Sequence, residues 1–138
     1  MVHSTSISLD TKGHTDIHDI TGPVVRAVSA SGIRDGIVCI ANAGSTAGIT
    51  TVEFEPGALA DLTAALERLA PQQAHYAHDA TWHDGNGFAH LRSALVGASC
   101  SFPVADGRPV LGTWQQIVFL DFDNRPRTRE LVIVIVGQ

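Results

Sequence analysis

Short apolar runs of strand length recur between turn residues, and this pattern constrains the fold more than any other feature of the 138 residues. Residues 36–41 (GIVCIA) are almost wholly apolar and residues 49–54 (ITTVEF) are β-branched, so each run has the length and composition of a strand. Residues 4–9 alternate polar and apolar side chains, which is typical of a half-buried strand. Further strands are expected at residues 99–104, 114–122 and 130–136.

Helical periodicity is confined to three stretches. Four leucines spaced three or four residues apart predict a helix over residues 58–69, after Gly57 and before Pro71. A second helix is expected between Asp19 and Gly32, and a third over residues 88–96. The mixture of strands and helices, in a chain of ordinary domain length, predicts one α+β domain over residues 1–138.

Charge and hydropathy exclude two classes of partner. The net charge is −5 and Lys12 is the only lysine, whereas nucleic-acid binding draws its affinity from many basic side chains. No apolar stretch approaches the roughly 20 residues of a membrane helix, and the first residues do not resemble a signal peptide. We therefore expect a cytoplasmic protein with no nucleic-acid and no membrane partner. Its low charged fraction, 17%, favours contacts between subunits.

The segment most suited to chemistry is polar and rich in histidine. Residues 72–90 hold four histidines, two aspartates and an asparagine: His75, His78, His83, His90, Asp79, Asp84 and Asn86. Imidazole and carboxylate groups are the usual ligands of a catalytic zinc, but the spacing matches no established metal motif. Three interpretations remain open, namely a metal site, acid–base or anion-binding chemistry without a metal, and a hydrogen-bonded loop.

Two further features are ambiguous on residue type alone. Residues 42–48 (NAGSTAG) offer the hydroxyls of Ser45 and Thr46 beside glycines, which suits either a phosphate-binding loop or a turn between strands. Glu53 lies in an apolar strand, so it needs a buried partner if it points inward and is an ordinary surface residue if it points outward.

Several motifs together resemble the YjbQ-type family, whose members are often described as secondary thiamine-phosphate synthases or as uncharacterised proteins. These motifs are GSTAGITTVE, YAHD, WHDGNGFAHLRSALVGAS, FPVADG and LGTWQQIVFLDFD with RPRTR, in this order. The likeness extends over nearly the whole chain. It implies an α+β fold with a seven-stranded β-sandwich and two to three helices, assembled as a homotrimer.

The resemblance also implies a site near the subunit boundaries. It assigns catalytic roles to His78, His90, Asn86, Asp84 and Glu53, and phosphate binding to Ser45, Thr46 and Arg129. His78 and His90 are the candidate ligands of a divalent metal, zinc or magnesium.

One position departs from the family pattern. Many members have His-Thr-Thr where this chain has Gly44-Ser45-Thr46, and glycine can neither bind a metal nor move a proton. The missing histidine would have to be replaced by His75 or His83 if the mechanism needs it.

The function expected from the resemblance is that of a thiamine-phosphate synthase-type transferase. It joins a pyrimidine methyl diphosphate to a thiazole phosphate, so its partner is a small phosphorylated molecule. The alternative is a metal- or anion-binding trimer whose synthase activity is only incidental.

Overall fold

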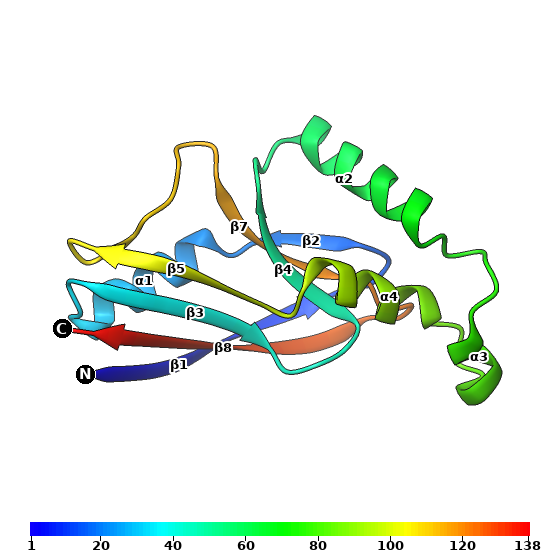
Figure 1. Cartoon of the computed structure of the whole chain (residues 1–138), viewed down its shortest axis with the longest axis horizontal. Coiled ribbons are helices and arrows are strands. Elements are labelled where there is room, and N and C mark those ends of the chain that lie inside the picture. Colours follow the sequence, from blue (N-terminus) through cyan, green and yellow to red (C-terminus); the bar gives the residue numbers. More distant parts are fainter.

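The computed structural model describes all residues from 1 to 138, and two antiparallel sheets form its framework (Figure 1). The five-stranded sheet has the order β1 (Val2–Thr11), β8 (Arg127–Gly137), β3 (Gly36–Asn42), β5 (Ser99–Ala105) and β6 (Arg108–Pro109). The three-stranded sheet has the order β2 (Asp16–Asp19), β7 (Gln116–Asp121) and β4 (Ala47–Val52). The helices are α1 (Thr21–Ser31), α2 (Pro56–Leu69), α3 (Ala77–Trp82) and α4 (Gly87–Val96).

The predicted α+β class is confirmed, but the numbers of strands and helices differ from the expectation. There are eight strands rather than seven, because β2 has four residues and β6 two, too few to show a period in the sequence. There are four helices rather than two to three, since α3 forms inside the histidine-rich segment. None of its six residues is buried, so it has no apolar stripe for sequence analysis to detect.

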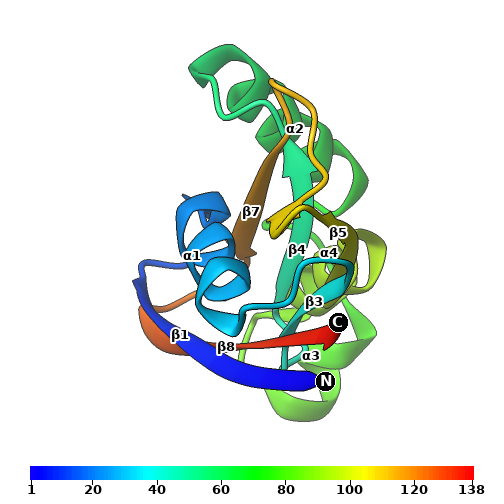
Figure 2. The same ribbon diagram turned by 90° about the vertical axis from the view of Figure 1, so that its left-hand side faces the viewer.

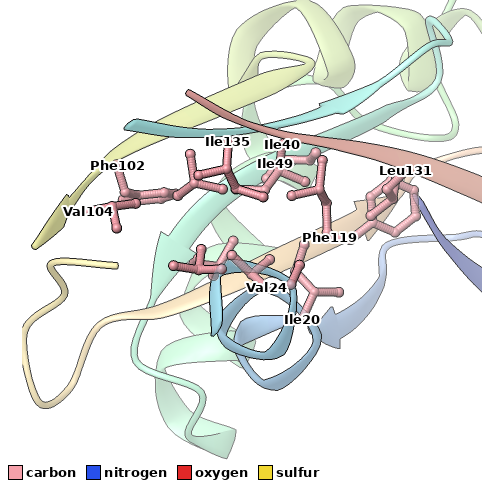
Figure 3. Close-up of a cluster of buried hydrophobic side chains, with 14 of the residues drawn as sticks. Ile20, Val24, Ile40, Ile49, Phe102, Val104, Phe119, Leu131 and Ile135 are labelled. Atoms are coloured by element: carbon pink, nitrogen blue, oxygen red, sulfur yellow. The ribbon is translucent and has the colours of Figure 1, made fainter. Parts of the chain in front are cut away.

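The main core lies between the five-stranded sheet on one side and α1 with the three-stranded sheet on the other (Figure 3). Ile133 and Ile135 of β8 point into it from the large sheet, and Phe119 of β7 points back from the small one. Val24 and Val28 lie four residues apart on α1 and present one apolar face to the same core. Burial of these side chains fixes β7 and β8 relative to one another.

A second, smaller core covers the opposite face of the small sheet. Val118 and Leu120 alternate with the main-core residues of β7 and pack against Phe88 of α4 and Leu66 of α2. At Gly48, an added Cβ atom would lie 2.7 Å from Cγ1 of Val96, so the missing side chain lets α4 cross β4 closely. This crossing places the end of α4 beside the beginning of β4, whereas α2 extends away from β1 and β8 (Figure 2).

The outer face of the five-stranded sheet carries apolar side chains without a covering layer. Three pairs lie directly opposite each other on β3 and β8, namely Ile37 with Val136, Cys39 with Val134 and Ala41 with Val132. Ile37 and Val136 are more than half exposed. Apolar surface of this extent is unusual on a single chain in water and is typical of a contact surface. None of the helices is long and apolar enough to span a membrane.

Candidate functional site

Two ion pairs with buried carboxylates lie where β7 ends and β8 begins. Asp121 ends β7 and Asp123 follows it, and both side chains are fully buried. Arg129 binds Asp121 through two hydrogen bonds, with Nε donating to Oδ2 at 2.7 Å and Nη2 donating to Oδ1 at 2.9 Å. Arg127 Nε donates to Asp123 Oδ2 at 2.6 Å. Buried carboxylates need such partners, because burial without them disfavours the charged form.

Threonine hydroxyls complete the hydrogen bonding of this Arg–Asp cluster, which comprises Asp121, Asp123, Arg127 and Arg129. The Thr46 hydroxyl donates to Asp123 Oδ2 at 3.1 Å and accepts from Arg129 Nη2 at 2.8 Å. Thr46 is buried and its hydroxyl is bonded to Asp123 and Arg129, which indicates a positioning role, while its contact with phosphate stays a prediction. Burial raises the pKa of Asp121, but hydrogen bonds from Arg129 and Thr11 outweigh it and hold that pKa below its ordinary value.

The cluster also positions the beginning of α4. Asn86 immediately precedes this helix, and its Nδ2 donates to Asp123 Oδ1 at 3.3 Å. The other side-chain atom, Asn86 Oδ1, is buried and has no hydrogen-bond partner. A buried acceptor without a partner costs stability, so it is a natural contact point for a ligand donor or cation.

His78 of α3 and His90 of α4 face each other. Their ring centroids are 4.2 Å apart and the ring planes are inclined by 36°. The two helices are held together where Asp79 Oδ1 accepts a hydrogen bond from the Gly87 amide at 2.9 Å. Between them the chain reverses through left-handed residues, His83 at φ 57° and Gly85 at φ 69°. This reversal brings α3 back onto α4 and pairs the imidazoles.

The histidine pair lies within a group that could bind a metal. His78 Nδ1 is 3.6 Å from Asp79 Oδ1 and 3.6 Å from Asp84 Oδ1, and it is buried without a hydrogen-bond partner. One ligand atom from each of these three residues lies within 4.8 Å of the others. His90, expected as the second metal ligand, is outside this group. Asp79 follows His78 directly in α3, and the turn after α3 brings Asp84 to the same imidazole.

His90 differs from an exposed histidine in its acid–base behaviour. Burial lowers the pKa of His90, and the neighbouring His78 lowers it further. Its imidazole is therefore neutral at neutral pH and can accept a proton or a hydrogen bond. It also lines a hollow of about 280 Å³ together with Ser45 and Ser93. Ser45 is exposed at this hollow, so its hydroxyl is open to a ligand.

Glu53 is not brought to the histidine pair within one chain. It is exposed beyond the end of β4, whereas Ser45 and Thr46 precede the beginning of that strand. Six strand residues separate the two ends, which corresponds to about 20 Å. His75 and His83, the possible replacements for a histidine at position 44, are exposed and lie outside the group around His78.

Sequence reasoning missed the two acidic residues at the centre of the cluster. Asp121 and Asp123 stand in an apolar run, FLDFD, followed by the basic run RPRTR. A carboxylate inside a buried strand needs a partner, and two arginines of the following basic run, Arg127 and Arg129, supply it. The apolar run with two aspartates, followed directly by a basic run, is the sequence feature that indicates buried ion pairs.

Comparisons with known proteins agree on one family. The family model of the UPF0047 protein YjbQ-like family matches residues 5–138. A UPF0047 protein of Methanocaldococcus jannaschii is 38% identical over 130 residues, which are 94% of this chain and 91% of that protein. The UPF0047 protein YugU of Bacillus subtilis is 35% identical, over 96% of this chain and 98% of its own length.

Solved structures show the same fold. A YbjQ-like protein of unknown function from Sulfolobus solfataricus superposes with a TM-score of 0.94 and is 33% identical, covering 100% of this chain and 99% of the other. A protein of the yjbq/upf0047 family from Clostridium acetobutylicum superposes with a TM-score of 0.87 and is 34% identical, covering 96% of this chain and 99% of the other.

Removal of one charge from the Arg–Asp cluster should destabilise the fold. Asp121→Asn leaves Arg129 without its carboxylate in a buried place, so we expect the free energy of unfolding to fall by about 3 kcal/mol. The control is Asp106→Asn, which breaks an exposed pair with Arg34 and should change it by less than about 0.5 kcal/mol. Urea denaturation measures both. Equal effects of the two variants would contradict a stabilising role for the cluster.

His90 should make stability depend on pH. Because its pKa is lowered in the folded chain, the unfolded chain takes up the proton first as pH falls below the ordinary value of 6.5. Stability conferred by neutral His90 is thus complete above that pH and is lost as pH falls towards the lowered pKa. We expect the Tm of His90→Gln to fall less than that of the wild type between pH 7.5 and pH 5. Parallel curves for the two proteins would refute this assignment.

Proposed function

The chain belongs to the UPF0047 family of YjbQ-like proteins, and we propose that it is a metal-assisted enzyme acting on small phosphorylated molecules. The observation that carries the proposal is the environment of His78 Nδ1. This atom is buried, has no hydrogen-bond partner and lies 3.6 Å from an oxygen of each of two carboxylates. An imidazole nitrogen held beside carboxylates without a hydrogen bond is well suited to a cation.

The donor set fits a divalent ion. His78, Asp79 and Asp84 would hold it, and a nitrogen with two carboxylate oxygens suits zinc, while the two carboxylates also suit magnesium. Such an ion would supply positive charge for the oxygens of a phosphate or diphosphate. Three protein groups would leave ligand positions open for substrate or water.

The proposed reaction is of the thiamine-phosphate synthase type. The thiazole nitrogen forms a bond to the methylene carbon of the pyrimidine, the bond from that carbon to the diphosphate oxygen breaks, and pyrophosphate leaves with the electron pair. The Ser45 hydroxyl and Arg129 Nη1 would donate hydrogen bonds to phosphate oxygens as negative charge develops there. Asn86 Oδ1 would orient a donor of the substrate.

The acid–base role of His90 in this proposal follows from its lowered pKa. Neutral imidazole accepts hydrogen bonds, so His90 would hold a donor group of the pyrimidine rather than act as an imidazolium towards the leaving group. His90 and Ser45 line the same hollow, which would place the two reacting molecules at adjoining positions.

We further propose that the protein works as a homotrimer. The uncovered face of Ile37, Val132, Val134 and Val136 supplies an apolar contact surface between copies. Assembly would also account for Glu53, because the length of β4 prevents it from reaching His78 of its own chain. If Glu53 belongs to the site, it must come from a neighbouring subunit.

A second function has one observation in its favour. Gly44 places no side chain at a position next to Asn42 and Arg129, so the site lacks an acid–base group there. A trimer that binds a metal or an anion, with only incidental synthase activity, would need no such group. Metal binding without product formation would support this second function.

Substitution of His78 should remove the metal and the activity together. We expect the wild-type protein to bind about one zinc or magnesium ion per chain and to form thiamine phosphate from the two precursors. His78→Ala should lose both properties, whereas the exposed control His83→Ala should keep them. Elemental analysis and a product assay measure the two. A metal-free protein inactive with either ion would refute the proposal.

A charge on the outer sheet face should dissociate the assembly. Val134 is half-buried at the centre of that face, so Val134→Lys would bury a lysine between subunits. Light scattering should then report the 14.6 kDa chain, whereas the wild type and the loop variant Val110→Lys should have three times this mass. A trimeric Val134→Lys protein would show that another surface joins the subunits.

A further inference from the structure

A second hollow lies where β3 ends and β8 begins. Its volume is about 460 Å³, sufficient for a small molecule. It differs from the hollow at His90 and Ser45, with which it shares no lining residue. The lining consists of three polar or charged side chains from β8, one apolar residue and two residues from the end of β3 and the following loop: Thr128, Arg129, Glu130, Val132, Asn42 and Ala43.

Arg129 presents unused hydrogen-bond donors at this hollow. Its Nε and Nη2 are engaged by Asp121 and Thr46, while Nη1 makes no hydrogen bond within the protein. The bidentate pairing holds the guanidinium in one orientation, and only 11% of the side chain is exposed. The Nη1 hydrogens are therefore preorganised for an acceptor oxygen from outside the chain.

Asn42 supplies a second donor. Its residue is 6% exposed, and its Nδ2 is buried without a hydrogen-bond partner. A buried amide without an acceptor is destabilising, so a ligand oxygen that reaches it gains the full hydrogen bond. The terminal torsion of asparagine has a broad energy well, which lets the amide turn towards the hollow that it lines.

Gly44 lies between the two donors. A Cβ atom at this position would be 3.2 Å from Asn42 Nδ2 and 3.5 Å from Arg129 Nη1, so both donors flank the side of Gly44 that carries no side chain. Any larger residue would cover them. The other polar groups at the hollow do not compete, since Thr128 donates its hydroxyl to Asp10 and Glu130 is an exposed carboxylate without donors.

We propose that Arg129 Nη1 and Asn42 Nδ2 form an oxyanion subsite beside Gly44, which binds the phosphate or carboxylate group of a small molecule. The subsite rests on the proposed function for the identity of the substrate. It adds to that function a defined binding place for one anionic end of the substrate. Asn42 is then a binding residue, and Gly44 is the position that keeps both donors accessible. Binding of a simple oxyanion requires neither the metal nor the reaction.

The test is calorimetric titration of the full-length protein with inorganic phosphate and, separately, with acetate, in the absence of added metal. Asn42→Asp keeps the size of the side chain but replaces the donor by a carboxylate that competes for Arg129. We expect at least about tenfold weaker phosphate binding, the equivalent of one charge-assisted hydrogen bond. Gly44→Val should weaken binding as well, because its side chain would cover both donors. The Gly44→Val variant provides an independent check if circular dichroism shows that Asn42→Asp is poorly folded.

Two controls separate this subsite from binding of phosphate to any surface arginine. Arg34→Ala and Arg108→Ala each remove an exposed guanidinium outside this hollow, so both should bind phosphate like the wild type. Because phosphate binding needs no turnover of the precursors, the subsite stays distinguishable from the proposed reaction, which can fail while phosphate still binds. Acetate that competes with phosphate would indicate a general oxyanion site, and phosphate binding alone a phosphate-selective one.

Competition by acetate and binding of phosphate alone both agree with the subsite. Three outcomes would overturn it: no binding of either anion by the wild type, unchanged binding in both Asn42→Asp and Gly44→Val, or an equal loss of binding in Arg34→Ala or Arg108→Ala.

Discussion

The double pairing of Asp121 with Arg129 and of Asp123 with Arg127 is the interaction on which the arrangement of the site depends. It joins the end of β7 in one sheet to the beginning of β8 in the other, with both carboxylates fully buried. Through Thr46 it reaches the loop before β4, and through Asn86 it reaches α4. Residues 121–129 and two segments distant from them in sequence therefore converge on one set of charges. A shift of any of the three would leave a buried charge without its partner.

Much of the framework could be predicted from the sequence because its elements carry strong local signals. The leucine repeat of α2 and the apolar runs of β3 and β5 are examples, and each appears close to its expected bounds. Helix α3 and strand β6 could not be predicted, since the former buries no side chain and the latter has only two residues. Elements of this kind are set by their tertiary surroundings rather than by periodicity.

The candidate site was predictable in outline but not in its internal roles. Residue types indicate the histidine-rich segment, and His78, His90, Asp84 and Asn86 lie at the junction of α3 and α4. The engagement of Thr46 and the hydrogen bond of Asp79 to the Gly87 amide depend on side-chain geometry across elements. Likewise, only the direction of β4 shows that Glu53 lies at the wrong end of the strand to meet His78 in its own chain.

The absence of buried residues in α3 has a consequence for the dynamics of the protein. This helix is attached by few contacts, chiefly the Asp79 hydrogen bond to Gly87 and the stacked imidazoles, so its local opening requires little free energy compared with the sheets. Any ion or substrate that joins His78 to Asp84 would close the same opening. Occupancy of the site would then slow amide hydrogen exchange along α3 and leave exchange in the sheets unchanged. The conformational entropy that α3 loses on binding would lower the affinity of the ligand.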